Sequence, residues 1–406
     1  MAKVSVGARF RRALNDLLRS ANNAKPGALA ATVNEAVRPL GVDVTVFLAD
    51  YEQRALRPLP EPAKPLSQPT PIVGTIAGRA YTTITTQVGG TDPDRLWVPI
   101  TNSTARLGVL KVCLPDSLDS ADQDVREGCR ALANLVGQLL QSNAAHGDVL
   151  EAVRRTRPMS HASELLWRML PPLTFACEEM VLAAVIEPCY EVGGDAFDYT
   201  VDATVASLAV LDAVGHGLRA GLACAVTLAA MRSARREGQG LGGVAHAADA
   251  AITAGWTDVP FVTAVLAELD LERGHLRYIN AGHPPPVLLR HGRAVRTLTG
   301  GRRLPLGFAD PGARIATEAL EPGDRVLFYT DGVTEARDDH DAQFGLPRLV
   351  ELAERLAASQ LPTAEVARRL SHAVLEHQRG QRQDDTTLLL IEWSRTGARK
   401  DPSCWS

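Results

Sequence analysis

Apolar and polar positions along the first 140 residues predict an α/β unit. Apolar residues recur at helical spacing over residues 8–21 and 27–40, which predicts two opening helices. Short apolar runs at residues 42–48, 96–100 and 107–114 predict buried strands. We therefore expect a sheet that is covered by helices.

Two stretches between these strands have other patterns. Residues 56–71 are rich in proline, which has no backbone N–H to donate, so we expect a loop there. Residues 79–88 alternate between apolar and polar side chains, which predicts a further strand. The layout of two helices, a sheet and a closing helix resembles a GAF-type sensor domain. That resemblance implies a small-molecule ligand, although the stretch contains no ligand signature.

A long helix is predicted from about residue 121. Its apolar residues recur at spacings of four and three, the pattern of a coiled-coil seam: Val125, Cys129, Leu132, Val136 and Leu139. Two interpretations are open, because the stripe could join two copies into a homodimer or pack on the sheet of its own unit. Pro158 predicts a break before a short helix over residues 163–170.

The pattern from about residue 180 to residue 393 predicts a second, larger α/β region. Strands are predicted over residues 180–186, 206–211, 261–270, 275–280, 287–290, 325–329 and 386–393, and helices over 217–236, 241–254, 346–358 and 363–379. A hairpin at residues 272–274 indicates that much of this sheet structure is antiparallel.

These patterns divide the chain of 406 residues, which is long enough for more than one core. We predict a GAF-like domain over residues 8–140, a helical linker over 141–172, a larger α/β domain over 173–395 and a tail over 396–406.

Composition narrows the class of protein. The formal net charge is −4, with 45% hydrophobic and 22% charged residues, so no basic field favours nucleic acid or a membrane surface. No apolar run has membrane-spanning length. The six cysteines are dispersed without a C-x-x-C pair, which argues against zinc and disulfides and for a reducing, cytoplasmic location.

Candidate chemistry is concentrated in five short motifs of the C-terminal half. Four of them place aspartate beside glycine or at a strand end, and one has asparagine instead: G-G-D-A-F-D at 193–198, D-A-V-G-H-G at 212–217, N-A-G-H-P at 280–284, T-D-G-V-T-E at 330–335 and D-D-T-T at 384–387. Strand ends can present carboxylates to one shared cleft, and clustered carboxylates bind hard cations such as Mg²⁺ or Mn²⁺. A pair of such ions favours hydrolysis at phosphorus.

Together with F-V-T-A-V-L-A-E-L-D at 261–270, these motifs closely resemble the SpoIIE-like branch of the bacterial, metal-dependent type-2C Ser/Thr phosphatases, in the same order over about residues 160–395. The resemblance implies an αββα sandwich, in which two antiparallel sheets are flanked by helices, with two Mn²⁺ or Mg²⁺ ions at one edge. It also implies that a metal-bridging water hydrolyses phosphoserine or phosphothreonine without a phosphoenzyme.

Carried over by position, the metal ligands and catalytic residues are Asp195, Asp212, Asp331 and Asp384, with the backbone carbonyl of Ala213. Residues expected to support the ligands are Asp198, Asp385, Gly194 and His216. His216 and His283 could act as acid or base, but with glycine beside them we expect them to fix loop geometry instead. Glu335 is expected to brace its loop, and Arg219 is a guess for a phosphate contact.

One residue departs from the pattern of the family. Val214 stands where these phosphatases usually have serine before G-H-G. The ligand set stays whole, so we expect lower activity rather than a different reaction. G-G-D-A-F also looks like the G-G-D-E-F motif of diguanylate cyclases, but Ala196 replaces the acid and a cyclase has no use for the later motifs.

The resemblance leads to two hypotheses about function. The first is a cytoplasmic protein Ser/Thr phosphatase that acts on a phosphorylated anti-sigma-factor antagonist, and so controls a sigma factor by partner switching. The second is a weakly active or inactive phosphatase-fold module that binds and sequesters a phosphoprotein. Only Val214 favours the second.

Overall fold

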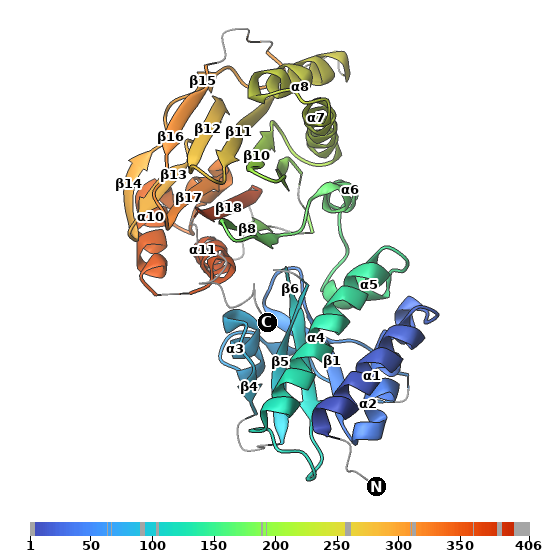
Figure 1. The fold of residues 1–406 in the computed structure, drawn as a ribbon. Coiled ribbons are helices and arrows are strands. Elements are labelled where there is room, and N and C mark those ends of the chain that lie inside the picture. The colour runs from blue at the N-terminus through green and yellow to red at the C-terminus, as the bar shows by residue number, and fades with distance from the viewer. Residues whose placement is uncertain are drawn as a thin grey trace. The chain divides into compact units, whose positions relative to one another are not determined.

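The computed structural model describes residues 5–62, 64–65, 67–89, 94–102, 105–187, 190–191, 193–255, 261–308, 310, 314–359, 361–379 and 384–393. They form two compact units that meet in sequence between Arg157 and Pro158 (Figure 1). That boundary lies inside the stretch 141–172 that we expected to be a linker. The expected tail over 396–406 lies outside the described residues.

The N-terminal unit is built on one antiparallel sheet with the strand order β3-β2-β1-β6-β5-β4. Its strands are β1 (Asp43–Ala49), β2 (Ala55–Pro58), β3 (Thr70–Pro71), β4 (Gln87–Val88), β5 (Arg95–Asn102) and β6 (Ala105–Cys113), and its helices are α1 (Val6–Ala21), α2 (Leu29–Val37), α3 (Ile76–Thr83), α4 (Gln123–Ala144) and α5 (Val149–Arg154). Side chains of β1 alternate between two cores. Val44 and Val46 pack with α1, α2 and α4, whereas Phe47 packs with α3.

Two of the expectations for this unit are wrong. Residues 79–88 do not form one strand, because α3 occupies the first half of that stretch and only Gln87 and Val88 pair with β5. The hydroxyl of Thr75 caps the helix by accepting from the Gly78 amide at 2.9 Å. The proline-rich stretch 56–71 is also not all loop, since parts of β2 and β3 lie in it.

The stripe with coiled-coil spacing belongs to the core of the N-terminal unit. Val125, Cys129, Leu132 and Val136 are fully buried among residues of α1, α2 and the sheet. Helix α4 lies so close to β5 that a Cβ on Gly137 would be 2.1 Å from the Thr101 carbonyl oxygen. The structure therefore supports the second interpretation, in which these side chains belong to the core of their own unit, and it gives no support to a homodimer through this seam.

The C-terminal unit contains two sheets. One has the order β15-β12-β11-β10-β9, with β16 also paired to β12, and the other has the order β14-β13-β17-β18-β8-β7. The strands are β7 (Thr174–Ala176), β8 (Met180–Glu187), β9 (Asp195–Val201), β10 (Val205–Ala213), β11 (Val262–Asp270), β12 (His275–Ala281), β13 (Val287–Arg290), β14 (Arg293–Thr297), β15 (Arg302–Arg303), β16 (Ala316–Ala319), β17 (Asp324–Tyr329) and β18 (Thr386–Trp393). All the described pairings between these strands are antiparallel except β12 with β15.

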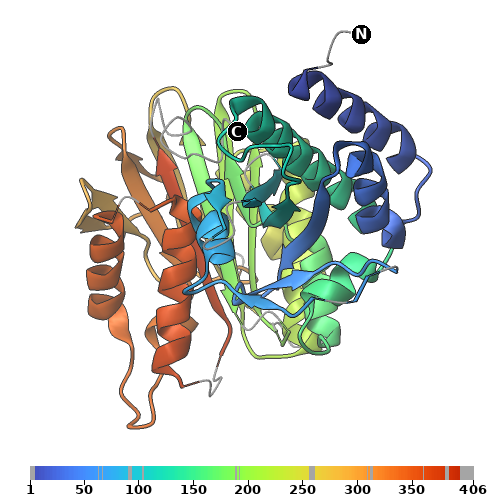
Figure 2. The ribbon, with the colours of Figure 1, turned by 90° about the horizontal axis from the view of Figure 1, so that it is seen from below.

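Helices cover both sheets, which gives a helix–sheet–sheet–helix order of layers (Figure 1). The helices of the unit are α6 (His161–Met169), α7 (Leu218–Arg236), α8 (Leu241–Gly255), α9 (Asp331–Thr334), α10 (Gly345–Ala357) and α11 (Thr363–His377). Helices α7 and α8 contact the first sheet, and α11 contacts β8 and β18 of the second. Helices α10 and α11 lie side by side (Figure 2). This mixed α/β architecture agrees with the predicted phosphatase fold.

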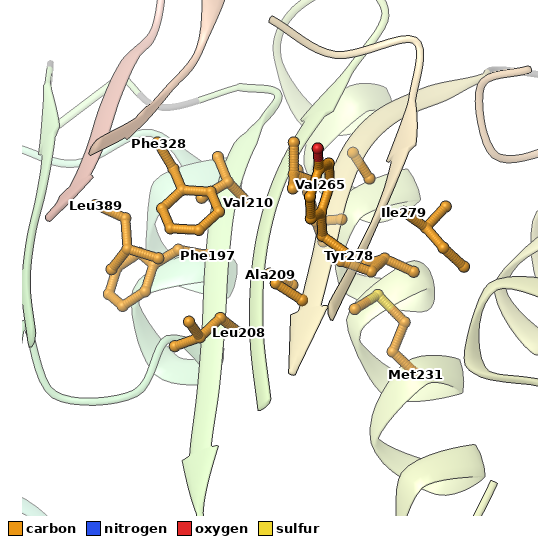
Figure 3. Packing of buried hydrophobic residues seen from close by; sticks show 14 of the residues in the cluster. Phe197, Leu208, Ala209, Val210, Met231, Val265, Tyr278, Ile279, Phe328 and Leu389 are labelled. Carbon is orange, nitrogen blue, oxygen red and sulfur yellow. The ribbon is translucent and has the colours of Figure 1, made fainter. Parts of the chain in front are cut away.

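Apolar side chains from the two sheets meet in one core between them. Phe197 of β9 and Val210 of β10 face Phe328 of β17 and Leu389 of β18 (Figure 3). Burial of large apolar side chains is the main stabilising contribution to such a core. Among the described residues, no helix is both long and apolar enough to cross a bilayer.

We predict that Leu132→Ala lowers the free energy of unfolding of the N-terminal unit by about 2–5 kcal/mol, because it leaves a cavity in a closed core. Urea denaturation of the full chain measures the loss, and light scattering measures the mass. Leu18→Ala is the matched control, since Leu18 lies on α1 with 46% of its surface exposed. A dimer that Leu132→Ala splits without loss of stability would contradict this assignment.

Candidate functional site

Asp195 and Asp212 form the centre of the candidate site. Asp195 begins β9 and Asp212 is the second-last residue of β10, and their Cα atoms are direct partners across the antiparallel pair. Direct cross-strand partners project from the same face of a sheet. Phe197 and Val210 are also partners, two residues away on each strand, and they face the second sheet. Asp195 and Asp212 therefore continue the inter-sheet row where the apolar core ends.

The second sheet brings in the other acidic residues. Thr330 follows β17, Asp331 begins α9, and Asp384 and Asp385 precede β18, which pairs with β17. The Thr330 hydroxyl donates to Asp195 Oδ2 at 2.7 Å and accepts from the Thr387 amide at 2.9 Å. A single threonine thus connects the two sheets at the site.

Asp385 holds the G-G-D loop in place. Its Oδ2 accepts hydrogen bonds from the amides of Gly193 at 2.6 Å and Gly194 at 2.7 Å, across 192 and 191 residues of sequence. Hydrogen bonds from backbone amides to a carboxylate are among the stronger ones in proteins. We expected Asp385 to support the ligands, and we propose that its contact with the G-G-D loop is this support.

Two glycines let these loops approach each other. A Cβ on Gly193 would be 2.6 Å from the Gly217 nitrogen, so this position joins the G-G-D loop to the G-H-G loop. A Cβ on Gly332 would be 1.8 Å from the Asp385 carbonyl oxygen, so no larger residue fits between T-D-G and D-D. Four motifs from distant parts of the chain are therefore in close contact.

Burial and mutual repulsion raise the pKa values of Asp195 and Asp212. Asp195 is 2% exposed, and its pKa is well above the usual range because of desolvation and the charges of Asp212 and Asp385. The pKa of Asp212 rises to about 7 through desolvation and the charges of Asp331, Asp384 and Asp385. The aspartates are thus near enough to interact strongly, and a cation among them would relieve that repulsion.

The donor atoms suit a hard cation, because every candidate ligand is an oxygen. The Ala213 carbonyl, the fifth expected ligand, lies against Gly194, where a Cβ would be 2.6 Å from its oxygen. Among the described residues, however, no three Asp, Glu, His or Cys side chains are already arranged to hold a single ion.

Other residues expected at the site lie elsewhere or play a different part. Asp198 projects from the opposite face of β9 to Asp195 and pairs with Arg232 at 2.7 Å and Arg235 at 3.1 Å on α7. Because it fastens that helix to the first sheet, Asp198 is not a neighbour of the candidate ligands. His216 is exposed in the loop between β10 and α7.

Two further contributors escaped the sequence analysis. Thr330 was recognised only as part of T-D-G, although a hydroxyl directly before a candidate ligand was a usable signal. Cys224 of α7 is fully buried, and its Sγ donates to the Gly194 carbonyl at 2.6 Å. Nothing in its sequence context indicated this role, since it lies within an ordinary helical stretch.

Comparison with known proteins supports a SpoIIE/PP2C-type phosphatase domain in the C-terminal unit. Residues 202–394, slightly less than half of the chain, match the family model for Stage II sporulation protein E (SpoIIE). The SiaA-PP2C domain of Pseudomonas aeruginosa is 24% identical, with a TM-score of 0.50 over 58% of this chain and 95% of that domain. That likeness concerns the fold.

Two curated proteins are related in sequence. Phosphoserine phosphatase RsbU of Bacillus subtilis is 24% identical over 215 residues, which are 53% of this chain and 63% of RsbU. Protein IcfG of Synechocystis is 32% identical over 135 residues, which are 32% of this chain and 20% of IcfG. The chain therefore spans less than two thirds of either relative.

We predict that the metal-free protein loses stability as the pH rises, because of Asp212. The pKa of this group is raised from 3.8 to about 7 in the folded state. The folded state consequently holds the proton more tightly, so the contribution to stability is present below about pH 4 and is lost as the pH rises through about 7.

Melting temperatures in EDTA between pH 5 and pH 8.5 test this. Asp212→Asn should melt progressively higher than the wild type as the pH rises, and added Mn²⁺ should stabilise it less. Asp202→Asn, at an exposed turn residue, is the control and should follow the wild type. Identical pH profiles for Asp212→Asn and the wild type would contradict the assignment.

Proposed function

We propose that this protein is a metal-dependent protein Ser/Thr phosphatase. The observation that carries the proposal is that four separated motifs bring Asp195, Asp212, Asp331 and Asp384 to one edge of a two-sheet sandwich. Singly, such aspartates are common turn residues. Their convergence, with raised pKa values for Asp195, Asp212 and Asp331, is typical of a functional site.

The proposed ligands of two Mn²⁺ or Mg²⁺ ions are these four aspartates and the Ala213 carbonyl. Such ions, when bound, supply an activated water and stabilise the charge of an in-line displacement at phosphorus. Thr330 would orient Asp195 through its hydrogen bond. Asp385 would keep the G-G-D loop at the distance from β18 that the site requires. Both are supporting contacts of the kind that metal sites depend on.

The proposed substrate is a phosphoserine or phosphothreonine protein resembling an anti-sigma-factor antagonist, in a cytoplasmic partner-switching pathway. Its support is the resemblance of the motifs, the SpoIIE model match and the relative named as a phosphoserine phosphatase. The fold alone would not identify the substrate, because one fold can serve many functions.

For the N-terminal unit we propose a GAF-like sensor that takes a small-molecule ligand. The support is its layout, an antiparallel sheet with α1 and α2 before it and α4 after it. The family match begins at residue 202 and does not extend to this unit.

Val214 favours one alternative, a phosphoprotein-binding module with little or no turnover. Its side chain is 46% exposed beside the proposed site, where the resemblance leads us to expect a hydroxyl. An apolar residue there cannot supply a hydrogen bond to substrate or solvent.

Hydrolysis of p-nitrophenyl phosphate in Mn²⁺ tests the proposal. We expect turnover by the wild type and a loss of about a hundredfold or more in Asp212→Asn and Asp331→Asn, on the scale seen when transition-state charge stabilisation is removed. Asp202→Asn should retain full activity, because Asp202 lies in the turn between β9 and β10, at the other end of these strands from Asp195 and Asp212. Equal rates in all four proteins would refute the phosphatase proposal.

A second experiment distinguishes the phosphatase from the phosphoprotein-binding module. A chromatography experiment would present a phosphoserine protein to the wild type in excess Mn²⁺ and follow both retention and released phosphate. Retention without release would support the binding module, and Val214→Ser should then restore some turnover if the missing hydroxyl is the cause.

A further inference from the structure

The polar row of the candidate site continues one strand further than the carboxylates. Thr263 of β11 is the direct Cα partner of Asp212, which is itself the partner of Asp195. In the adjacent row, Val265 is the partner of Val210, and Val210 of Phe197. Since direct partners share a face, the Thr263 side chain projects from the same face as both aspartates.

His283 lies at the end of this row. Its Nδ1 is 2.7 Å from the Thr263 hydroxyl oxygen, and the residue is only 5% exposed. The loop that carries it is fixed by Asn280, whose side chain accepts from the His283 amide at 2.8 Å and donates to the His283 carbonyl at 2.9 Å. The imidazole is therefore presented to Thr263 by a rigid turn rather than by a flexible loop.

The imidazole has properties that a purely structural core residue does not need. Burial lowers its pKa to about 3, so the ring is neutral at physiological pH. An interaction of the ring with the main chain of Tyr329, next to Thr330, raises this pKa and so offsets part of the effect of burial. Its Nε2 is buried and makes no hydrogen bond within normal limits to the described residues. Buried polar atoms without partners are rare and call for an explanation.

These contacts place His283 between the two halves of the site. On one side is Thr263, beside Asp212 of the first sheet. On the other is the end of β17, where Thr330 and Asp331 begin the contribution of the second sheet. Thr330 connects Asp195 to the second sheet in the same way. Two hydroxyl-bearing residues thus flank the aspartate pair.

We infer that Thr263 and His283 are positioning residues, which hold Asp212 and the end of β17 at the spacing required for cation binding. The inference rests on the proposed function, because it assigns a task to residues around the proposed ligands. Neither residue is proposed to bind the cation. Loss of such supporting contacts commonly lowers metal affinity by about 10–100-fold.

Mn²⁺ titration of the full-length protein, followed by electron paramagnetic resonance of the free ion, tests the inference without relying on turnover. Thr263→Val keeps the shape of the side chain but removes the hydroxyl, and we expect it to weaken Mn²⁺ binding by about 10–100-fold. Thr263→Ser retains the hydroxyl and should bind within about threefold of the wild type, on the same scale of supporting contacts. The serine variant thus provides a conservative rescue.

Thr227→Val is the control for the same substitution elsewhere in the unit, because the hydroxyl of the buried Thr227 bonds, among the described residues, to the Ala223 carbonyl within α7. It should bind Mn²⁺ like the wild type. His283→Gln gives a second readout: it should weaken binding as Thr263→Val does, and the double variant should lose little more. Melting curves in EDTA verify that each variant is folded.

The outcomes separate the two levels of the proposal. Wild-type affinity in Thr263→Val, or an equal loss in Thr227→Val, would overturn the positioning role while the metal site itself stands. A wild type that binds no Mn²⁺ would remove the metal site, and this inference with it. Selective weakening in Thr263→Val and His283→Gln, with binding retained by Thr263→Ser, would establish it.

Discussion

Electrostatic repulsion among buried carboxylates is the constraint on which the site depends. The interior of a protein weakens charge interactions far less than water does, so several acids at one edge oppose the folding of their own loops. The structure counteracts this with hydrogen-bond donors, two from the backbone and one from a side-chain hydroxyl. Asp385 receives the amides of Gly193 and Gly194, and Asp195 receives the Thr330 hydroxyl. A cation bound among the carboxylates would reduce the repulsion that remains.

The same constraint explains why the glycines are where they are. A carboxylate can accept backbone amides only if the chain comes close, and a side chain on Gly193 or Gly332 would collide with the neighbouring loop. The apolar core between the sheets then fixes the distance over which these contacts act. Phe197 and Val210 stand two residues from the aspartate pair on their strands, so packing of the core and spacing of the acids are mechanically connected.

Much of this architecture was predictable from the sequence. The strand over residues 386–393 was predicted with the bounds that the structure has, because its apolar run at 388–391, with threonines before it and tryptophan at the end, is typical of a buried strand. Strand β9 was missed, since D-A-F-D-Y-T-V mixes a site residue and an ion pair with its apolar positions. The spacing along α4 was read correctly, but a helix on a sheet and a coiled coil need the same stripe, so sequence could not choose between them. Asp198 was expected beside the ligands because it belongs to the same motif as Asp195. Side chains alternate between the two faces of a strand, however, so Asp198 projects from the other face of β9.

The central place of β18 has a consequence for the order in which the protein can assemble. This strand lies between β17 and β8, although β8 precedes it by about two hundred residues of sequence. Until its residues leave the ribosome, the two halves of the second sheet present unpaired edges, and Asp385 cannot reach the G-G-D loop. Pairings of such long range are slow to form, and unpaired edges invite association between chains. The candidate site is therefore incomplete in the nascent chain until β18 has been synthesised, and the edges of β8 and β17 stay open to other chains until then.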